Sequence, residues 1–212
     1  MKREGVGAVS PVTKEVFPSH ILYPSGHFLD TIKHLVETGV IGSELADPWK
    51  VRLAEHKEMI AKTKSNAENG DVEAMYCLGE WHWNGIEGFQ EHRGEAYKWY
   101  KKASDLRFPM AMARVGQCLL SVNRSNGTAA STAEGIVLLA LAAERGSDKA
   151  CFLLGDTYYY GRHGIEKNEK EAKHLLEKAL AEDKCEYNHL EDEEAENARE
   201  LLDEMESMGW DR

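Results

Sequence analysis

The sequence predicts an all-α protein, a right-handed α–α superhelix (solenoid) of about three helix-pair repeats with flanking capping helices. One sequence pattern recurs at a nearly constant spacing, which is typical of a repeat array. Residues that start and end helices recur with the same spacing. Apolar residues fall between them at helical intervals, so each unit is predicted to be a pair of helices.

The first marker of the repeat is the pattern A-x-x-G-x-x-x-A-x-x-x-L-G. It occurs at 67–79, 104–116 and 143–155. The middle copy is degenerate, because Arg107 replaces the first glycine and Val115 replaces the leucine. Successive copies begin 37 and 39 residues apart, which predicts repeats of nearly equal length.

A second marker follows each copy of the first. It is a small residue with an alanine seven positions later, and it occurs at Ala96, Gly135 and Ala172, followed by Ala103, Ala142 and Ala179. Because two different markers share one period, we predict a repeat array over 67–180. Its units are 67–103, 104–142 and 143–180.

Helix boundaries can be predicted inside the first and third repeats. Asp71 and Ser147 are expected N-caps, since a short side-chain oxygen can accept an orphan backbone N–H. The glycines before them, Gly70 and Gly146, stand where a preceding helix ends in a left-handed residue.

Gly85 and Gly161 are then predicted to end the first helix of each pair, and the second helices are predicted at 92–104 and 168–180. Small residues such as Gly79 let two helix backbones approach closely. We expect the leucine position of the marker to point into the shared interior; it is occupied by Leu78, Val115 and Leu154.

These residues resemble the SEL-one-like repeat family, relatives of the tetratricopeptide repeats. The resemblance covers 67–180 and is closest in repeats one and three. The middle repeat has Val122 where the others have a loop glycine, so its loop is predicted between Ser121 and Ala133. The resemblance implies a helical solenoid with roles in complex assembly and signalling.

The segments before the array divide into two parts. Residues 1–24 contain three prolines and no helical period, so they are predicted to form an irregular arm. Residues 25–66 are predicted to form flanking helices, one at 27–38 and one at 48–68. The second is expected to start at Asp47-Pro48, with proline at the first helical position.

Residues 181–212 are predicted to form an acidic capping helix. An apolar stripe runs through Ala195, Ala198, Leu201, Leu202, Met205 and Met208. The stretch from Glu186 to Glu206 has ten acidic residues and only Arg199 opposing them. We interpret it as the solvated cap that closes a solenoid core, and the alternative is a docking surface for a basic partner.

The resemblance implies that the first helix of each pair lines a concave surface. The positions that face this surface are Tyr76, Glu80, Trp83, Gln117, Leu120, Phe152, Asp156 and Tyr159. Aromatic anchors flanked by acceptors are typical of surfaces that bind a protein or peptide. The alternative is that several of these rings pack between neighbouring repeats.

Catalytic and metal-binding patterns are lacking in the sequence. It has no serine-nucleophile elbow, no phosphate-binding glycine loop and no paired-histidine zinc motif. The nine histidines are scattered, and His82 is expected to replace a packed tyrosine with one ring nitrogen satisfied. The four cysteines fall at different repeat positions, unlike those of disulfide-stapled relatives. We therefore expect no enzyme, no metal and no cofactor.

The net charge of −11 disfavours a nucleic-acid partner, because phosphate backbones are repelled. No apolar run is long enough for an export signal or a membrane span, so a cytoplasmic protein is expected, with the nucleus left open. The leading hypothesis is an adaptor or scaffold that binds a partner protein or peptide. The second is a structural subunit held through its ends and N-terminal arm, and an enzyme or metal protein is the third.

Overall fold

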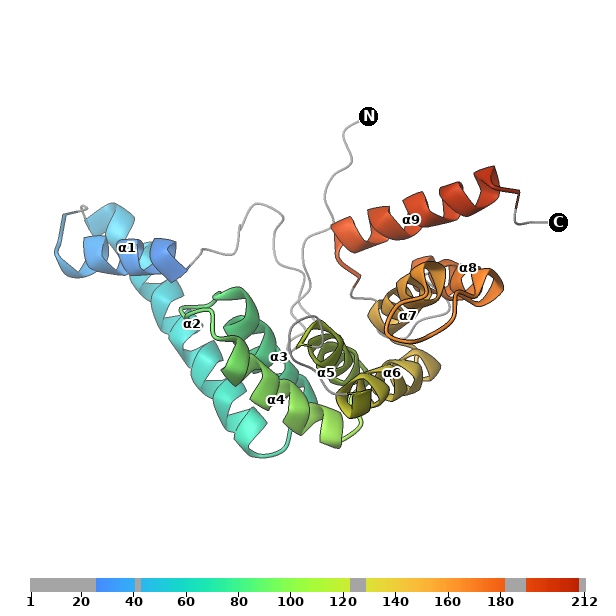
Figure 1. Cartoon of the computed structure of the whole chain (residues 1–212). Helices are drawn as coiled ribbons and strands as arrows, with labels where there is room; N and C mark the ends of the chain where they lie inside the picture. The colour runs from blue at the N-terminus through green and yellow to red at the C-terminus, as the bar shows by residue number, and fades with distance from the viewer. Residues whose placement is uncertain (1–25, 41–42, 123–128, 182–189, 210–212) are drawn as a thin grey trace. The chain divides into compact units, whose positions relative to one another are not determined.

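The computed structural model describes residues 26–40, 43–122, 129–181 and 190–209, and all regular structure in these ranges is helical (Figure 1). The helices are α1 (Gly26–Glu37), α2 (Ser43–Glu68), α3 (Val72–Asn84), α4 (Arg93–Asp105), α5 (Pro109–Val122), α6 (Ala129–Glu144), α7 (Asp148–Tyr160), α8 (Glu169–Leu180) and α9 (Asp192–Ser207). The predicted all-α class is confirmed. Within the described ranges, no helix combines the length and the apolar character needed to cross a bilayer.

The chain forms two compact units, Met1–Lys102 and Ala103–Arg212. In unit 1, α1 packs on α2 and α2 packs on α3. The predicted start of α2 at Pro48 is wrong, because the helix begins at Ser43. Proline removes one backbone donor, but Ala46, in the turn before it, is only 4% exposed. The helix therefore continues through Pro48 with one backbone hydrogen bond fewer, and the Ala46 side chain is packed in the turn before it.

The helix pair α3–α4 meets at a glycine. A Cβ atom on Gly79 would lie 2.3 Å from Cε1 of Tyr100, a distance that real contacts do not reach. Tyr100 is fully buried, and its hydroxyl donates a hydrogen bond of 2.8 Å to the Glu80 carboxylate. The ring therefore has no room to move away, and this crossing requires glycine.

Unit 2 repeats this contact twice. A Cβ on Gly116 would lie 2.8 Å from Cγ of Leu139, and a Cβ on Gly155 would lie 2.8 Å from Cγ of Leu176. Both leucines have no exposed surface. The residues that were predicted to fill the interior are also buried: Leu78, Val115 and Leu154, at 1%, 0% and 5% exposure.

The helices of unit 2 follow one stacking scheme. Helix α5 pairs with α6 and α7 pairs with α8, while α6 packs against α7 and α5 lies beside α7. Helix α9 packs on α8 and α7 in the same way, so it takes the place that the first helix of a further pair would have (Figure 1). Eight residues after its N-cap, where α7 has Gly155, α9 has Arg199.

The apolar stripe of α9 is shorter than predicted. Ala198, Leu201 and Met205 are buried in the core of unit 2. Met208, which was expected to continue the stripe, is 48% exposed because the helix ends at Ser207.

The predicted helix boundaries of the outer repeats are confirmed. Asp71 accepts hydrogen bonds of 3.0 Å from the backbone N–H groups of Glu73 and Ala74. Ser147 caps α7 in the same way. The C-cap residues Gly85 and Gly161 are left-handed, with φ of 63° and 66°.

The middle repeat differs from its prediction. An irregular loop was expected from Ser121 to Ala133, but α5 continues to Val122 and α6 already starts at Ala129. Alanine-rich sequence favours helix, which explains the early start of α6. Residues 123–128 and the predicted arm 1–24 lie outside the described residues.

Candidate functional site

A pocket of about 190 Å³ lies in unit 2 between α5 and α7. It is lined by Gln117, Leu120, Ser121, Leu153, Asp156, Thr157 and His163. Three of these residues, Gln117, Leu120 and Asp156, are among those predicted to face a partner. The register of the repeat thus places them together, because α5 and α7 are the first helices of adjacent pairs.

The two polar groups predicted for this pocket are fixed by neighbouring cations. The Asp156 carboxylate forms an ion pair of 2.6 Å with the Arg162 guanidinium. The Gln117 Oε1 atom accepts a hydrogen bond of 3.3 Å from Arg114. Side chains that are fixed in this way are preorganised to recognise a ligand, since little rotamer freedom remains to be lost.

The other hydroxyls of the pocket bond to their own helices. Ser121 Oγ donates to the Gln117 carbonyl, and Thr157 Oγ1 donates to the Leu153 carbonyl, both over 2.8 Å. Because both hydroxyl protons are donated within the helix, these two side chains present mainly their carbon atoms and the remaining oxygen lone pairs to the pocket. The pocket is therefore of mixed polarity and has the size of a side chain rather than of a cofactor.

His163 was not predicted to belong to this site. It follows the C-cap of α7 and has φ of 59°, which is unusual for a residue other than glycine. Strained backbone of this kind collects at functional sites. Glu87 occupies the equivalent position in repeat one and also has a positive φ, 56°, so this conformation recurs in the loop of the repeat, and the sequence contains no signal that would have found His163.

Two predicted partner-facing rings lie in the core of unit 2. Phe152 and Tyr159 are 6% and 5% exposed and share a buried cluster with Leu201 and Met205 of α9. Burial and a hydrogen bond to Glu204 raise the pKa of Tyr159 to about 12. In the described structure these rings contact the chain's own helix, as the alternative interpretation of packed rings expects.

The three predicted residues of repeat one belong to unit 1. Tyr76 is buried, with its ring 5.7 Å from that of Tyr100. Glu80 accepts the Tyr100 hydroxyl. Trp83 is half-buried, and the Arg93 guanidinium lies 4.0 Å from its ring centroid, which is a cation–π contact. One surface that combines them with the residues of unit 2 stays a prediction.

The sequence did not single out two buried cations, which anchor the start of α9. The side chains of Arg114 and Lys149 are only 7% and 5% exposed. Lys149 Nζ lies 2.7 Å from Glu194 and 3.2 Å from Glu191, and Arg114 lies 3.2 Å from Glu191. Lysine in the first turn of a helix opposes the helix dipole, so Lys149 was a signal for an external carboxylate.

The segment before α9 is fastened by a further contact. The Asp148 carboxylate accepts a hydrogen bond of 2.7 Å from the backbone N–H of Leu190. Burial works against the charged form of Glu191, but Lys149 and Arg114 outweigh it and lower the pKa of this carboxyl. The first carboxylates of the acidic run thus bind buried cations of the same chain, and the run also provides an exposed surface.

The described ranges contain no group of three or more histidine, cysteine or acidic side chains that could hold a metal ion. His82 packs edge-on against Phe89, with ring centroids 4.8 Å apart, and hydrogen-bonds the Gln90 backbone. Its Nδ1 atom is buried without a partner among the described residues. Burial and neighbouring carboxylates raise the pKa of the Cys77 thiol to about 12, so this cysteine is an unreactive core residue.

Comparison with known proteins agrees with this architecture. A 115-residue stretch of the chain is 28% identical to chitin synthase regulatory factor 3 of Schizosaccharomyces pombe. The match covers 54% of this chain and only 12% of that protein, so the likeness is limited to a small part of a much longer protein.

Solved structures show the same fold. The crystal structure of a Sel1 repeat protein from Oxalobacter formigenes is 28% identical, with a TM-score of 0.50, and the match covers 68% of this chain and 96% of that one. The protective antigen c5321 of uropathogenic Escherichia coli is 20% identical, with a TM-score of 0.58, over 93% of this chain and 38% of that one.

A model of the Sel1 repeat matches residues 72–108, 109–147 and 148–183. These three matches are contiguous and together cover more than half of the 212 residues. Each match contains one of the glycine-centred helix pairs described above. The chain therefore belongs to the Sel1 repeat family, with three repeats.

Proposed function

We propose that this protein is a non-enzymatic adaptor or scaffold that binds a peptide or domain of a partner through the first helices of its repeats. Sel1 repeats generally mediate interactions between proteins. The observation that supports a specific surface is the pocket between α5 and α7, which gathers Gln117, Leu120 and Asp156.

The chemistry of the pocket favours a polar side chain of the partner. Asp156 and Gln117 offer oxygen acceptors in fixed orientations, above the apolar carbons of Leu120 and Leu153. A pocket of about 190 Å³ accommodates one side chain, so it acts as an anchor, and the remaining contacts lie outside it. Trp83 of unit 1, which is half-buried, is a candidate for a second contact.

Phe152 and Tyr159 take a different role in this proposal. They support α7 from the side of α9 and do not touch the partner, because both are covered within the core of unit 2. Their loss is expected to weaken binding only through the position of α7.

The test places a photo-crosslinking amino acid at Ser121, on the exposed end of the pocket, and a control probe at Val137 on α6, which is 55% exposed. Partner adducts are expected from position 121 and not from position 137.

Gln117→Lys is expected to weaken binding of the purified partner at least 10-fold, because a cation then meets Arg114 and fills the pocket. Glu177→Lys on α8 is the matched control. Equal binding by both variants would contradict this site.

The alternative is a structural subunit held through its ends and its N-terminal arm. Two apolar residues of unit 1, Val40 and Val51, are 69% and 58% exposed and would be available to such a contact. Deleting residues 1–24 separates the two functions. Loss of complex incorporation with the Ser121 adducts intact supports the subunit role, whereas unchanged incorporation removes it.

A further inference from the structure

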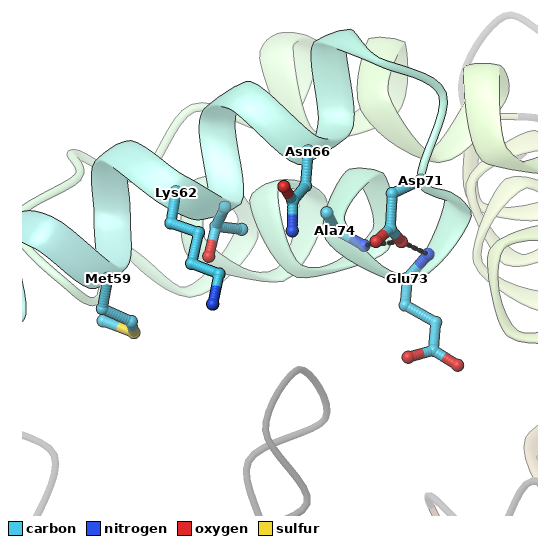
Figure 2. Close-up of a pocket in the computed structure, with 7 residues that line it drawn as sticks. Met59, Lys62, Asn66, Asp71, Glu73 and Ala74 are labelled. Carbon is cyan, nitrogen blue, oxygen red and sulfur yellow. Dashed lines mark hydrogen bonds between the residues drawn. The ribbon is translucent and has the colours of Figure 1, made fainter.

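A second pocket, also of about 190 Å³, lies in unit 1 between the end of α2 and the start of α3 (Figure 2). It is lined by Met59, Lys62, Thr63, Asn66, Asp71, Glu73 and Ala74. None of these residues belongs to the surface proposed above. The pocket thus requires its own explanation.

The pocket occupies a place that is apolar elsewhere in the chain. The end of α2 matches the end of α6, since Gly70 corresponds to Gly146. In this register Thr63 corresponds to Leu139, and Asn66 corresponds to Ala142. Both residues of α6 are fully buried and pack in the core. In α2, polar side chains have replaced that packing.

Thr63 is the most unusual of these side chains. It is 1% exposed, and its Oγ1 atom has no hydrogen-bond partner among the described residues. A buried hydroxyl without a partner has lost its hydrogen bonds to water and gained none in return, which is unfavourable. The Thr63 hydroxyl is therefore a candidate for a hydrogen bond to a molecule that enters the pocket, either water or a ligand.

Three other polar side chains around the opening also form no hydrogen bond or ion pair with the described residues. Across the part of the chain that the structure describes, neither Lys62 nor Asn66 nor Glu73 forms a side-chain hydrogen bond or an ion pair. In Figure 2 all three extend to the same side of the two helices. Asp71, in contrast, is engaged in capping α3.

We propose that this pocket receives a basic side chain, arginine or lysine, of a partner peptide. The Glu73 carboxylate pairs with the cation, while Thr63 Oγ1 and the Asn66 amide oxygen accept its N–H groups. The aliphatic stem lies against Met59 and Ala74. This binding is independent of the pocket between α5 and α7.

Charge selects a cation over an anion. The lining contributes two carboxylates and one ammonium, and the whole chain has a net charge of −11. Lys62 is exposed, so its long side chain can turn its ammonium into water when a cation enters. Lys62 is therefore expected to weaken the binding of basic peptides, which gives the proposal a test with a definite sign.

The experiment titrates the ¹⁵N-labelled full chain with acetyl-Gly-Arg-Gly-amide and follows its backbone amides by NMR. The citrulline peptide, which has the same shape without the charge, and the glutamate peptide are the comparisons. Saturable shifts at Thr63, Asn66 and Ala74 are expected with arginine alone. No saturable shift with arginine would mean that the pocket holds water only and would overturn the proposal, as would equal binding of citrulline or glutamate.

Charge variants test the assignment of each group. Glu73→Gln is expected to weaken arginine binding about 3- to 10-fold, since the charge pair is lost. Lys62→Gln is expected to strengthen it about 2- to 5-fold. Glu58→Gln, on α2 but outside the lining, is the control and should leave binding unchanged. Stronger arginine binding by Glu73→Gln together with weaker binding by Lys62→Gln would overturn the choice of a basic ligand.

Thr63→Val separates a ligand role from a structural one. Valine has the same shape and removes the unpaired hydroxyl, so the melting temperature should stay the same or rise. Arginine binding should fall about 5-fold. A lower melting temperature with unchanged binding would show that the hydroxyl serves the fold, and the proposal would then fail.

Discussion

At the scale of single residues, the helix pairs depend on a glycine eight positions after the N-cap. In α3 this is Gly79, against which the Tyr100 ring lies directly. Tyr100 is bonded to Glu80 and completely buried, so neither helix can yield without breaking other contacts.

Gly79→Ala is therefore expected to destabilise unit 1 by about 1–3 kcal/mol, the usual cost of overpacking a tight contact. Urea unfolding followed by circular dichroism measures the change. The control is Gly94→Ala in α4, where only the His92 ring lies nearby, with its Cε1 atom at 3.3 Å. Because alanine favours helix, this control should be neutral or stabilising. Equal losses in both variants would contradict the close-contact argument.

One residue of the degenerate middle repeat has a strained backbone conformation. Arg107 stands where the other repeats have Gly70 and Gly146, and it adopts the same left-handed conformation, with φ of 63°. A side chain in that conformation costs about 1–2 kcal/mol.

Arg107→Gly is expected to stabilise unit 2 by about 1 kcal/mol, less than the full strain because glycine also gains freedom in the unfolded chain. Arg107→Lys keeps the strain and the charge, so its stability should be unchanged. The midpoint of urea unfolding is the measurement. A glycine variant no more stable than the lysine variant would show that the arginine makes compensating contacts.

At the scale of elements, α9 is attached to unit 2 by two kinds of contact. Its apolar stripe enters the core, and its first turn holds the buried cations Arg114 and Lys149. Removing one partner of such a pair leaves a buried charge without compensation. The attachment of α9 can thus be weakened without altering the helix itself.

Lys149→Met is expected to weaken the docking of α9 by about 1–3 kcal/mol, the value of a charged hydrogen bond with its partner left unpaired. Hydrogen exchange at Ala198 and Leu201 should accelerate, while that of α5 should change little. The double variant Lys149→Met with Glu194→Gln removes both charges and should recover part of the loss. If the double variant loses as much as the sum of the single variants, the two groups are not coupled.

The same contact predicts a dependence on pH. The pKa of Glu191 is lowered in the folded state, so its contribution to stability is present above the unfolded value of 4.5 and is lost as the pH falls through the folded pKa. The protection factors of the α9 amides, which correct for the slower intrinsic exchange at low pH, should therefore fall below about pH 4.5. The Lys149→Met variant should show a shallower change over the same range.

Particular residues show how far the sequence could predict these elements. The caps Asp71 and Ser147 and the close-contact glycines follow from local rules, because the turn or the crossing needs that residue type. The burial of Phe152 and Tyr159 depends on where α9 docks, about 40 residues later, and no local rule contains that information. Pro48 misplaced the start of α2 because packing of Ala46 outweighed a backbone preference.

The candidate site was predictable to a similar extent. Repeat register brought Gln117, Leu120 and Asp156 to one pocket, because equivalent positions on adjacent first helices lie side by side. His163 entered through a loop conformation that a composition rule does not predict. The pocket at Thr63 could not be foreseen, since a threonine in a helix is ordinary until its hydroxyl is found buried without a partner.

At the scale of the whole molecule, the two units are expected to lose stability at different acidities. In unit 1, burial lowers the pKa of His82, against the opposing charge of Glu95. The unfolded imidazole titrates near 6.5 and takes up a proton more readily than the folded one. The contribution of neutral His82 to the stability of unit 1 is therefore present above pH 6.5 and declines below it. This decline begins at a higher pH than the loss expected for Glu191 in unit 2.

His82→Phe tests this order. Phenylalanine preserves the edge-on contact with Phe89 and removes the titrating group. Between pH 7 and 5.5 the variant should lose less stability in unit 1 than the wild type, whereas unit 2 should behave alike in both. Hydrogen exchange with mass spectrometry resolves the units separately. Identical acid sensitivity of unit 1 in both chains would rule out His82 as its cause.

Arg199 has a consequence for how such arrays change length. It stands on α9 where α3, α5 and α7 have the glycine that admits a second helix, so its side chain blocks a close companion on that face. A further helix could therefore not approach α9 on this face as closely as α8 approaches α7, unless residue 199 were small.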